Sequence, residues 1–231
     1  MDVIGQGFAE AARLLLSFDK EIYEIIALSL FVSLTSVFVS TCLGAPLGLL
    51  IGIRNFPGKR LLIRLIYALM STPPVVAGLV VFLFIMRRGP LGAWGLTFTP
   101  TAMIIAQTCL VTPIIIGLTY NIVKEKAVKV NHVAKLLGAN QFQGVKLLAF
   151  ELRVGLIAAV VTGFGRAISE VGAVMIVGGN IQGKTRVMTT YIAQLQSMGD
   201  YSRAIAVGIA LFLIAFLINT VLYNIQERGS L

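Results

Sequence analysis

The sequence predicts an all-α integral membrane protein with five transmembrane helices, an N-terminal amphipathic helix and a pair of short cytoplasmic helices. Of the 231 residues, 57% are hydrophobic and only 13% are charged, whereas soluble domains carry about 25% charged residues. The mean hydropathy is +0.90, and the apolar residues gather in runs long enough to cross a bilayer. The basic residues that give the chain its net charge of +9 lie mostly in short loops between those runs. Basic residues there set membrane orientation, so we expect no nucleic acid as a partner.

This pattern divides the chain into an amphipathic segment, a membrane domain and a polar tail, at residues 1–21, 22–223 and 224–231. The amphipathic segment is predicted to lie in the membrane interface. The first span, residues 22–53, is longer than the roughly 20 residues that a bilayer needs, which predicts a tilt or an overhang. It ends with Gly44, Gly48 and Gly52 at four-residue spacing, a small-residue face that indicates close helix packing.

The second span, residues 65–86, contains Pro73 and Pro74 in its middle, followed by Gly78. Tandem prolines remove two backbone donors and bend or break a helix. Hydrocarbon tolerates such a break only where protein or a wet cavity covers it. The segment is therefore predicted at an interior surface, either along a pathway or as a structural kink.

Three further apolar runs complete the prediction. The third span covers residues 99–123, the fourth covers 152–179, and the last covers 204–223. The fourth run holds Arg166 and Glu170, which lie on one face if the helix is continuous. Ionisable groups inside a span normally face the bundle interior or a cavity. The pair is interpreted either as a gate or pathway element or as a buried ion pair that fixes helix packing.

Residues 124–151 form a long polar interruption with five lysines and apolar residues at helical spacing. Two short amphipathic helices are predicted to flank residues 138–140, where Gly138 can adopt the left-handed conformation that ends a helix. This helix–turn–helix is interpreted as a plug for a soluble partner. The alternative is a solvated loop whose lysines only set orientation.

The distribution of basic residues predicts which side each loop faces. The loops on the side of residues 124–151 hold eleven Lys and Arg, against seven on the other side. The richer side should be cytoplasmic, so the N-terminus is expected outside and the C-terminus inside a cell membrane crossed several times.

Sequence motifs for chemistry are scarce. Residues 178–185 match the phosphate-loop pattern G-x-x-x-x-G-K-S/T, but the motif requires a preceding strand and a helix that follows directly. Here it follows a predicted span, so we interpret the match as accidental. Cys42 and Cys109 lie in apolar runs, and His132 has no His or Cys near it. We therefore expect no metal site, no bound cofactor and no catalytic residue.

Two motifs resemble the membrane permease subunit of an ABC importer, over about residues 22–223. Those permeases carry a cytoplasmic loop E-A-A-x3-G-x9-I-x-L-P, of which Ala134 and Gly138 are present here. His132 and Val133 replace E-A, and Leu148, Phe150 and Glu151 replace I, L and P. The block GFGRAISEVGAVMIVGGNI, from Gly163 to Ile181, is similar to the oxyanion branch of these permeases, most closely to those for tungstate. Molybdate and sulfate permeases typically have G-E-F-G where this chain has Ser169–Gly172.

The resemblance implies a non-enzymatic transport subunit for an oxyanion, with tungstate as the expected substrate and molybdate or sulfate as the alternative. It implies alternating access driven by ATP on two cytoplasmic ATP-binding subunits, an extracytoplasmic substrate-binding protein and a second permease copy, all in contact with membrane lipid. The implied ATPase-coupling residues are Ala134, Leu137, Gly138, Ala139, Asn140 and Phe142. The implied path or gate residues are Pro73, Pro74, Gly78, Arg166, Ser169 and Glu170. From another class, a self-sufficient channel or ion-coupled carrier remains an alternative.

Overall fold

A computed structural model describes residue 13 and residues 20–228, and within them it contains helices and no strand. The elements are α2 (Lys20–Ile53), α3 (Lys59–Met70), α4 (Pro74–Ile85), η1 (Gly92–Trp94), α5 (Pro100–Leu136), α6 (Gln141–Glu151), α7 (Arg153–Ile168), α8 (Gly172–Gly178), α9 (Met188–Ser197) and α10 (Tyr201–Arg228). The predicted all-α class is confirmed. Most of the predicted amphipathic segment, residues 1–21, and the end of the tail lie outside the described residues.

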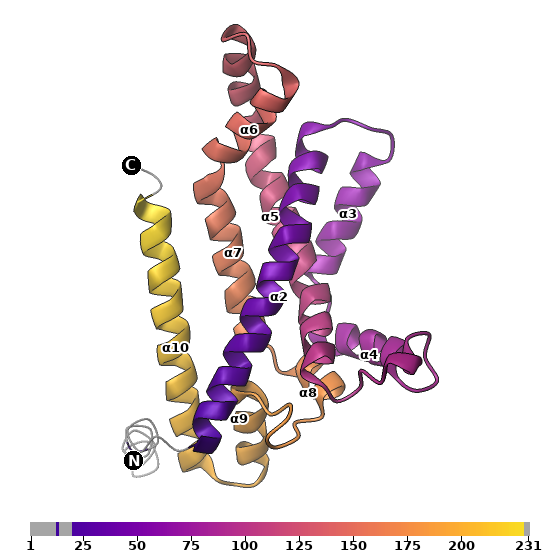
Figure 1. The fold of residues 1–231 in the computed structure, drawn as a ribbon, viewed down its shortest axis with the longest axis vertical. Coiled ribbons are helices and arrows are strands. Elements are labelled where there is room, and N and C mark those ends of the chain that lie inside the picture. Colours follow the sequence, from indigo (N-terminus) through magenta and orange to yellow (C-terminus); the bar gives the residue numbers. More distant parts are fainter. Residues whose placement is uncertain (1–12, 14–19, 229–231) are drawn as a thin grey trace.

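The long helices α2, α5, α7 and α10 run side by side along the long axis of the molecule (Figure 1). Three helices, α2, α5 and α10, are each long and apolar enough to cross a membrane, and two bent helix pairs raise the number of spans to as many as five. Five spans were predicted. The start of α2 and the end of α10 lie at opposite ends of the bundle (Figure 1), as an odd number of crossings requires.

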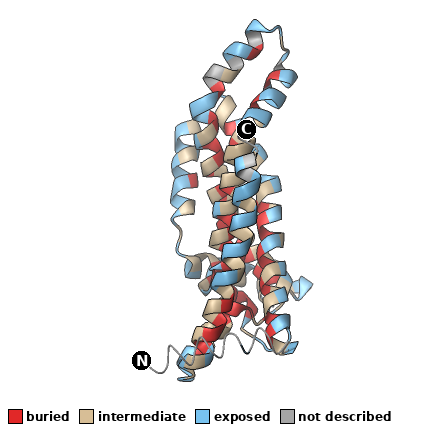
Figure 2. Ribbon diagram, turned by 90° about the vertical axis from the view of Figure 1, so that its left-hand side faces the viewer, coloured by how far each residue is buried: buried red, intermediate tan, exposed pale blue. Residues whose placement is uncertain are grey.

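Apolar side chains cover the outside of this bundle as well as its core. Figure 2 shows buried residues along the inward helix faces and exposed residues on the outer ones. The exposed residues include large apolar side chains on α2 and α10, such as Phe38, Phe212 and Leu217. An outer surface of this kind suits hydrocarbon and would be unfavourable in water.

The pairing of α2 with α5 is built on small residues. On α2, one face carries buried serines at 29, 33, 36 and 40 and continues through Gly44, Gly48 and Gly52. Without a Cβ, each of these glycines lies against α5: the nearest α5 atoms belong to Ile115 at Gly44, to Thr119 at Gly48 and to Val123 at Gly52. The prediction that these glycines serve close packing is confirmed.

Gly48→Ala is expected to destabilise the protein by about 1–3 kcal/mol, the usual effect of overpacking. An added Cβ would lie 2.7 Å from the Cβ of Thr119 and 2.8 Å from the backbone oxygen of Ile116, so the helices must move apart. Thermal unfolding in detergent would measure the loss. Gly208→Ala on α10 is the matched control because its Cβ would enter open space. Equal unfolding temperatures for the two variants would contradict the packing role.

Two predicted spans are broken. Residues 65–86 do not form one helix: α3 and α4 meet at an angle of 100° across Ser71–Pro73, and α4 extends sideways from the bundle (Figure 1). Residues 152–179 are likewise divided, because α7 ends at Ile168 and α8 begins only at Gly172. Glu170 therefore lies outside the helix that carries Arg166, which corrects the expectation of one continuous helix.

The polar segment 124–151 extends beyond the rest of the bundle (Figure 1), and we call it the projection. The predicted pair of separate helices is half right. The second helix is α6, but the first is the end of α5, which continues without interruption to Leu136. No Gly or Pro interrupts residues 118–136, so the helix passes from apolar to polar composition without ending.

Candidate functional site

The tip of the projection is a tight turn between α5 and α6. Gly138 has φ +73°, a left-handed conformation that favours glycine and ends α5 as predicted. Asn140 caps α6: its side-chain oxygen accepts from the Gln143 backbone N–H at 2.8 Å, and the Gln143 side chain accepts from the Asn140 N–H at 2.9 Å. This capping box fixes the direction in which α6 returns. Ala139, half-buried, donates its N–H to the Ala134 carbonyl.

Four large apolar side chains surround this turn and are exposed: Val133 at 51%, Leu136 at 76%, Leu137 at 77% and Phe142 at 79%. We call them the docking patch. Val133, Leu136 and Phe142 lie on helical backbone and Leu137 lies in the turn itself, with lysines before and after them in the sequence. An exposed apolar cluster on a polar extension is typical of a surface that another protein covers.

Buried contacts hold the docking patch away from the membrane helices. Leu148 and Leu152 are fully buried against Val123 and Ala127 of α5, which anchors the far end of α6. Ala134 is buried at the turn, so this predicted coupling residue supports the surface and does not form it. Sequence reasoning missed Val133 and Leu136 as surface residues, although their helical spacing with Leu137 was visible.

The two helix breaks, about 100 residues apart in the sequence, lie close together. Pro73 precedes α4 and Pro74 begins it, where a proline fits because the first helical N–H groups need no partner. A Cβ on Gly78 would lie 2.6 Å from the Ala173 Cα, so α4 and α8 are in backbone contact there. The structure therefore brings together the predicted path residues of both segments.

The Arg166–Glu170 pair lies at the second break. The Arg166 Nη2 and Glu170 Oε2 atoms are 3.9 Å apart, and the side chains are 38% and 4% exposed. The other carboxylate oxygen, Oε1, accepts from the Ala173 N–H at 3.1 Å, and the Glu170 carbonyl accepts from the Thr189 hydroxyl at 2.9 Å. Ser169 ends α7 with its hydroxyl donating to the Gly165 carbonyl. Glu170 is thus fixed from several elements, whereas Arg166 is partly free.

A buried polar network that sequence reasoning missed supports this break. The Gln107 side-chain amide on α5 donates to the Ala167 carbonyl at 3.0 Å, and its oxygen accepts from the Ser36 hydroxyl at 2.8 Å. The network joins α2, α5 and the last turn of α7. The signal was a glutamine inside an apolar run, because polar side chains within a span are expected to contact each other.

The end opposite the projection carries the glycine-rich loop with the phosphate-loop pattern. A helix, α8, precedes it where a phosphate loop needs a strand, and the Thr185 hydroxyl is bonded within the loop to the Gly178 carbonyl and the Ile181 N–H. The next helix, α9, begins only at Met188. The accidental match predicted from sequence is therefore confirmed.

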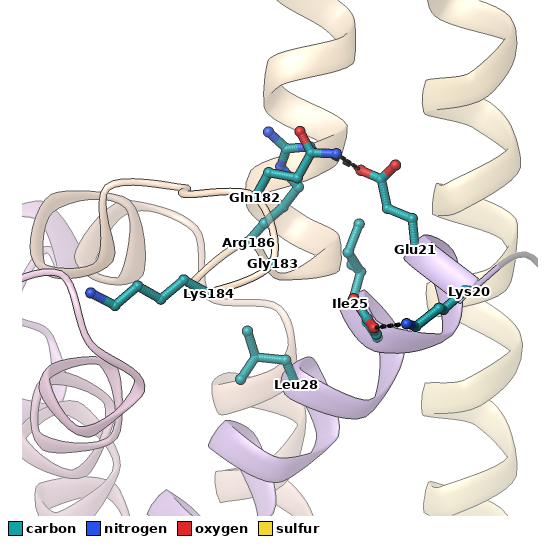
Figure 3. Close-up of a pocket in the computed structure, with 9 residues that line it drawn as sticks. Lys20, Glu21, Ile25, Leu28, Gln182, Gly183, Lys184 and Arg186 are labelled. Carbon is teal, nitrogen blue, oxygen red and sulfur yellow. Dashed lines mark hydrogen bonds and ion pairs between the residues drawn. The ribbon is translucent and has the colours of Figure 1, made fainter.

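Beside this loop is a cavity of about 510 Å³ between the start of α2 and residues 182–186 (Figure 3). Glu21 accepts from the Gln182 amide at 2.9 Å and pairs with Arg186 at 3.2 Å. Lys184 extends from the same loop, away from Glu21 (Figure 3). The ion pair fastens the first helix to the loop that follows α8.

The described helices contain no group of three or more His, Cys, Asp or Glu residues that could hold a metal ion. A helical bundle with an apolar outer surface, an exposed docking patch and paired helix breaks agrees with a membrane transport component. The chain belongs to the family of binding-protein-dependent transport system inner membrane components, whose model matches residues 44–228. A protein of this family is a multi-pass membrane permease of an ABC importer, which works with ATPase and substrate-binding partners.

Three relatives cover most of the chain. It is 52% identical over 228 residues to the tungstate uptake system permease protein TupB of Peptoclostridium acidaminophilum, covering 99% of this chain and 100% of the relative. It is 37% identical to a probable anion ABC transporter permease protein of Haloferax volcanii, with 89% and 90% covered. It is 35% identical to the tungstate uptake system permease protein TupB of Campylobacter jejuni, with 98% and 95% covered.

A solved structure supports the fold. A chain of the MetNI methionine ABC transporter, in an inward-facing conformation, superposes with a TM-score of 0.74 at 18% identity, covering 94% of this chain and 97% of that one. At this identity the likeness concerns the arrangement of helices alone.

Proposed function

We propose that this chain is the permease subunit of a tungstate importer. The observation that carries the proposal is the 52% identity, over essentially the whole of both chains, to a tungstate uptake permease. Sulfate permease proteins match at lower identity, such as 28% for one from Escherichia coli over 91% of this chain. The block around Ser169–Gly172 agrees with the tungstate assignment, because sulfate and molybdate permeases typically carry G-E-F-G at these positions.

In this proposal the chain has no ATPase site of its own, and the cytoplasmic ATP-binding subunits, two in the complex, bind the docking patch. The projection then faces the cytoplasm and the N-terminus lies outside, in the orientation that the basic loops favour. Lipid surrounds the apolar outer faces. A second copy of the chain completes the path, because one bundle of at most five spans has little interior to enclose it.

One helix links the docking patch to the helix breaks. α5 carries Gln107 at the break region and Leu136 in the docking patch, and is helical throughout. At 1.5 Å per residue these two positions are about 44 Å apart. A movement of the projection is thus passed to the α7–α8 break through one continuous helix, in which Pro113 is a point of bending. This supports alternating access driven from the ATPase side.

Reconstitution tests the proposal. Proteoliposomes with the permease, its ATPase and its binding protein are expected to take up tungstate only with ATP, and the binding protein is expected to prefer tungstate to molybdate and sulfate. Radiolabelled or mass-spectrometric uptake measures both. Uptake without ATP or partners would indicate a self-sufficient channel or carrier and contradict the proposal. Equal uptake of sulfate would contradict the substrate assignment.

A further inference from the structure

A cavity of about 680 Å³ lies at the projection end of the bundle, between the turn that joins α2 to α3 and the middle of α5. Its polar wall is formed by Asn55, Lys59, Arg60, Tyr120 and Lys124, and Ile63 belongs to its apolar wall. The lining residues include three cations and no carboxylate. We call it the basic pocket.

The three cations of the basic pocket are not equivalent. The Lys59 ammonium donates to the Arg54 carbonyl at 2.8 Å and, at 3.4 Å each, to the Gly52 carbonyl and the Asn55 side chain. Lys59 is therefore occupied in capping the end of α2. Arg60 and Lys124 are exposed, and the part of the chain that the structure describes offers them no ion-pair partner. These two charges are available to an occupant.

The start of α3 adds to the positive potential of the basic pocket. Gly58, with φ +83°, precedes the helix, no side chain caps it, and its first turn holds no acidic residue. The Lys59 N–H donates to the Phe56 carbonyl at 3.3 Å, but the positive end of the helix dipole remains without a compensating negative group. With Arg60 and Lys124 beside it, this end favours an anion that carries several acceptor oxygens, such as a phosphate diester.

The surroundings of the basic pocket are apolar on the side of α3. Ile53 and Phe56 before the helix and Ile63 on it line the basic pocket, and Phe56 is 39% exposed. A small inorganic anion would leave this surface uncovered, whereas a phospholipid places its phosphate among the cations and its acyl chains along the helix. Basic pockets between membrane helices are known binding sites for anionic headgroups.

We propose that the basic pocket binds the headgroup phosphate of an anionic membrane phospholipid. The occupant touches α3 and α5 at once, since Tyr120 and Lys124 belong to the helix that becomes the projection. A bound lipid therefore clamps the start of α3 to α5 about three turns before the docking patch, and tunes how freely the projection moves. The binding itself does not depend on the proposed transport function; only the tuning does.

Native mass spectrometry of the purified full chain tests the binding, with phosphatidylglycerol and phosphatidylcholine offered separately. Wild-type protein is expected to retain phosphatidylglycerol in preference. The double variant R60Q/K124Q is expected to bind it roughly thirtyfold more weakly, because it loses two lysine or arginine contacts. The matched control is R64Q/K126Q, which removes the same charge from the same two helices outside the basic pocket. It should bind as the wild type does.

Charge-retaining R60K/K124R checks that the loss comes from the missing charges, and its binding is expected to stay within about threefold of the wild-type value. Size-exclusion profiles establish that each variant is folded. Equal weakening in the control, or equal retention of both lipids, would overturn the proposal. So would displacement of the bound lipid by millimolar inorganic phosphate or tungstate, which would identify a soluble-anion site. Failure of lipid binding leaves the transport assay unaffected, so the two proposals fail separately.

Discussion

Replacing Leu137 and Phe142 together by aspartate is expected to abolish ATP-driven tungstate uptake while the permease remains folded. Both side chains are more than three-quarters exposed, so the permease loses few contacts of its own. In the complex, however, two carboxylates would have to be buried where apolar side chains dock. Central apolar anchors of an interface contribute about 2 kcal/mol or more, so the ATPase should bind at least roughly thirtyfold more weakly.

Co-purification of the ATPase with a tagged permease, and uptake in proteoliposomes, measure the two effects. Met198→Asp is the control: this methionine is 70% exposed at the opposite end of the bundle and should leave co-purification unchanged. Normal co-purification of the Leu137/Phe142 variant would show that the ATPase binds another surface of the permease. A lowered unfolding temperature would show that the side chains support the permease itself.

The turn of the projection was predictable because its signals are local. Gly138 ends a helix and Asn140 begins another, and both rules act within a few residues. The unbroken passage of α5 into the projection was missed because hydropathy changes at Lys124 while helix propensity does not. Composition indicates where a helix leaves the membrane, but only a breaker ends it.

Tertiary contacts decide the parts that sequence reasoning left open. Pro73 and Pro74 predict a break, yet the 100° turn of α4 depends on its contact with α8 at Gly78 and Ala173. The second break had no proline signal. It is held by hydrogen bonds from Gln107 and Thr189 to backbone carbonyls at residues 167 and 170, and such long-range partners cannot be read from a single apolar run.

The same contacts bear on whether Arg166 and Glu170 serve transport or only packing. Glu170 is buried and bonded to the start of α8, whereas more than a third of the Arg166 side chain is exposed and its contact with the carboxylate is long, at 3.9 Å. A contact this long contributes little to stability. An exposed guanidinium beside a helix break is, by contrast, suited to contact a passing oxyanion.

Arg166→Gln is therefore expected to lower tungstate uptake about tenfold or more while changing the unfolding free energy by less than about 1 kcal/mol.

Glu170→Gln keeps an oxygen for the Ala173 N–H and leaves Arg166 unpaired, so the anion should be held longer. Both the maximal uptake rate and the apparent KM should then fall. Glu170→Ala also removes the acceptor and should destabilise the protein by about 1–3 kcal/mol. Uptake and thermal unfolding of the single variants and of R166Q/E170Q together form a double-mutant cycle. If Arg166→Gln destabilised the protein as much as Glu170→Ala, with unchanged uptake per folded molecule, the pair would be structural and the path would lie elsewhere.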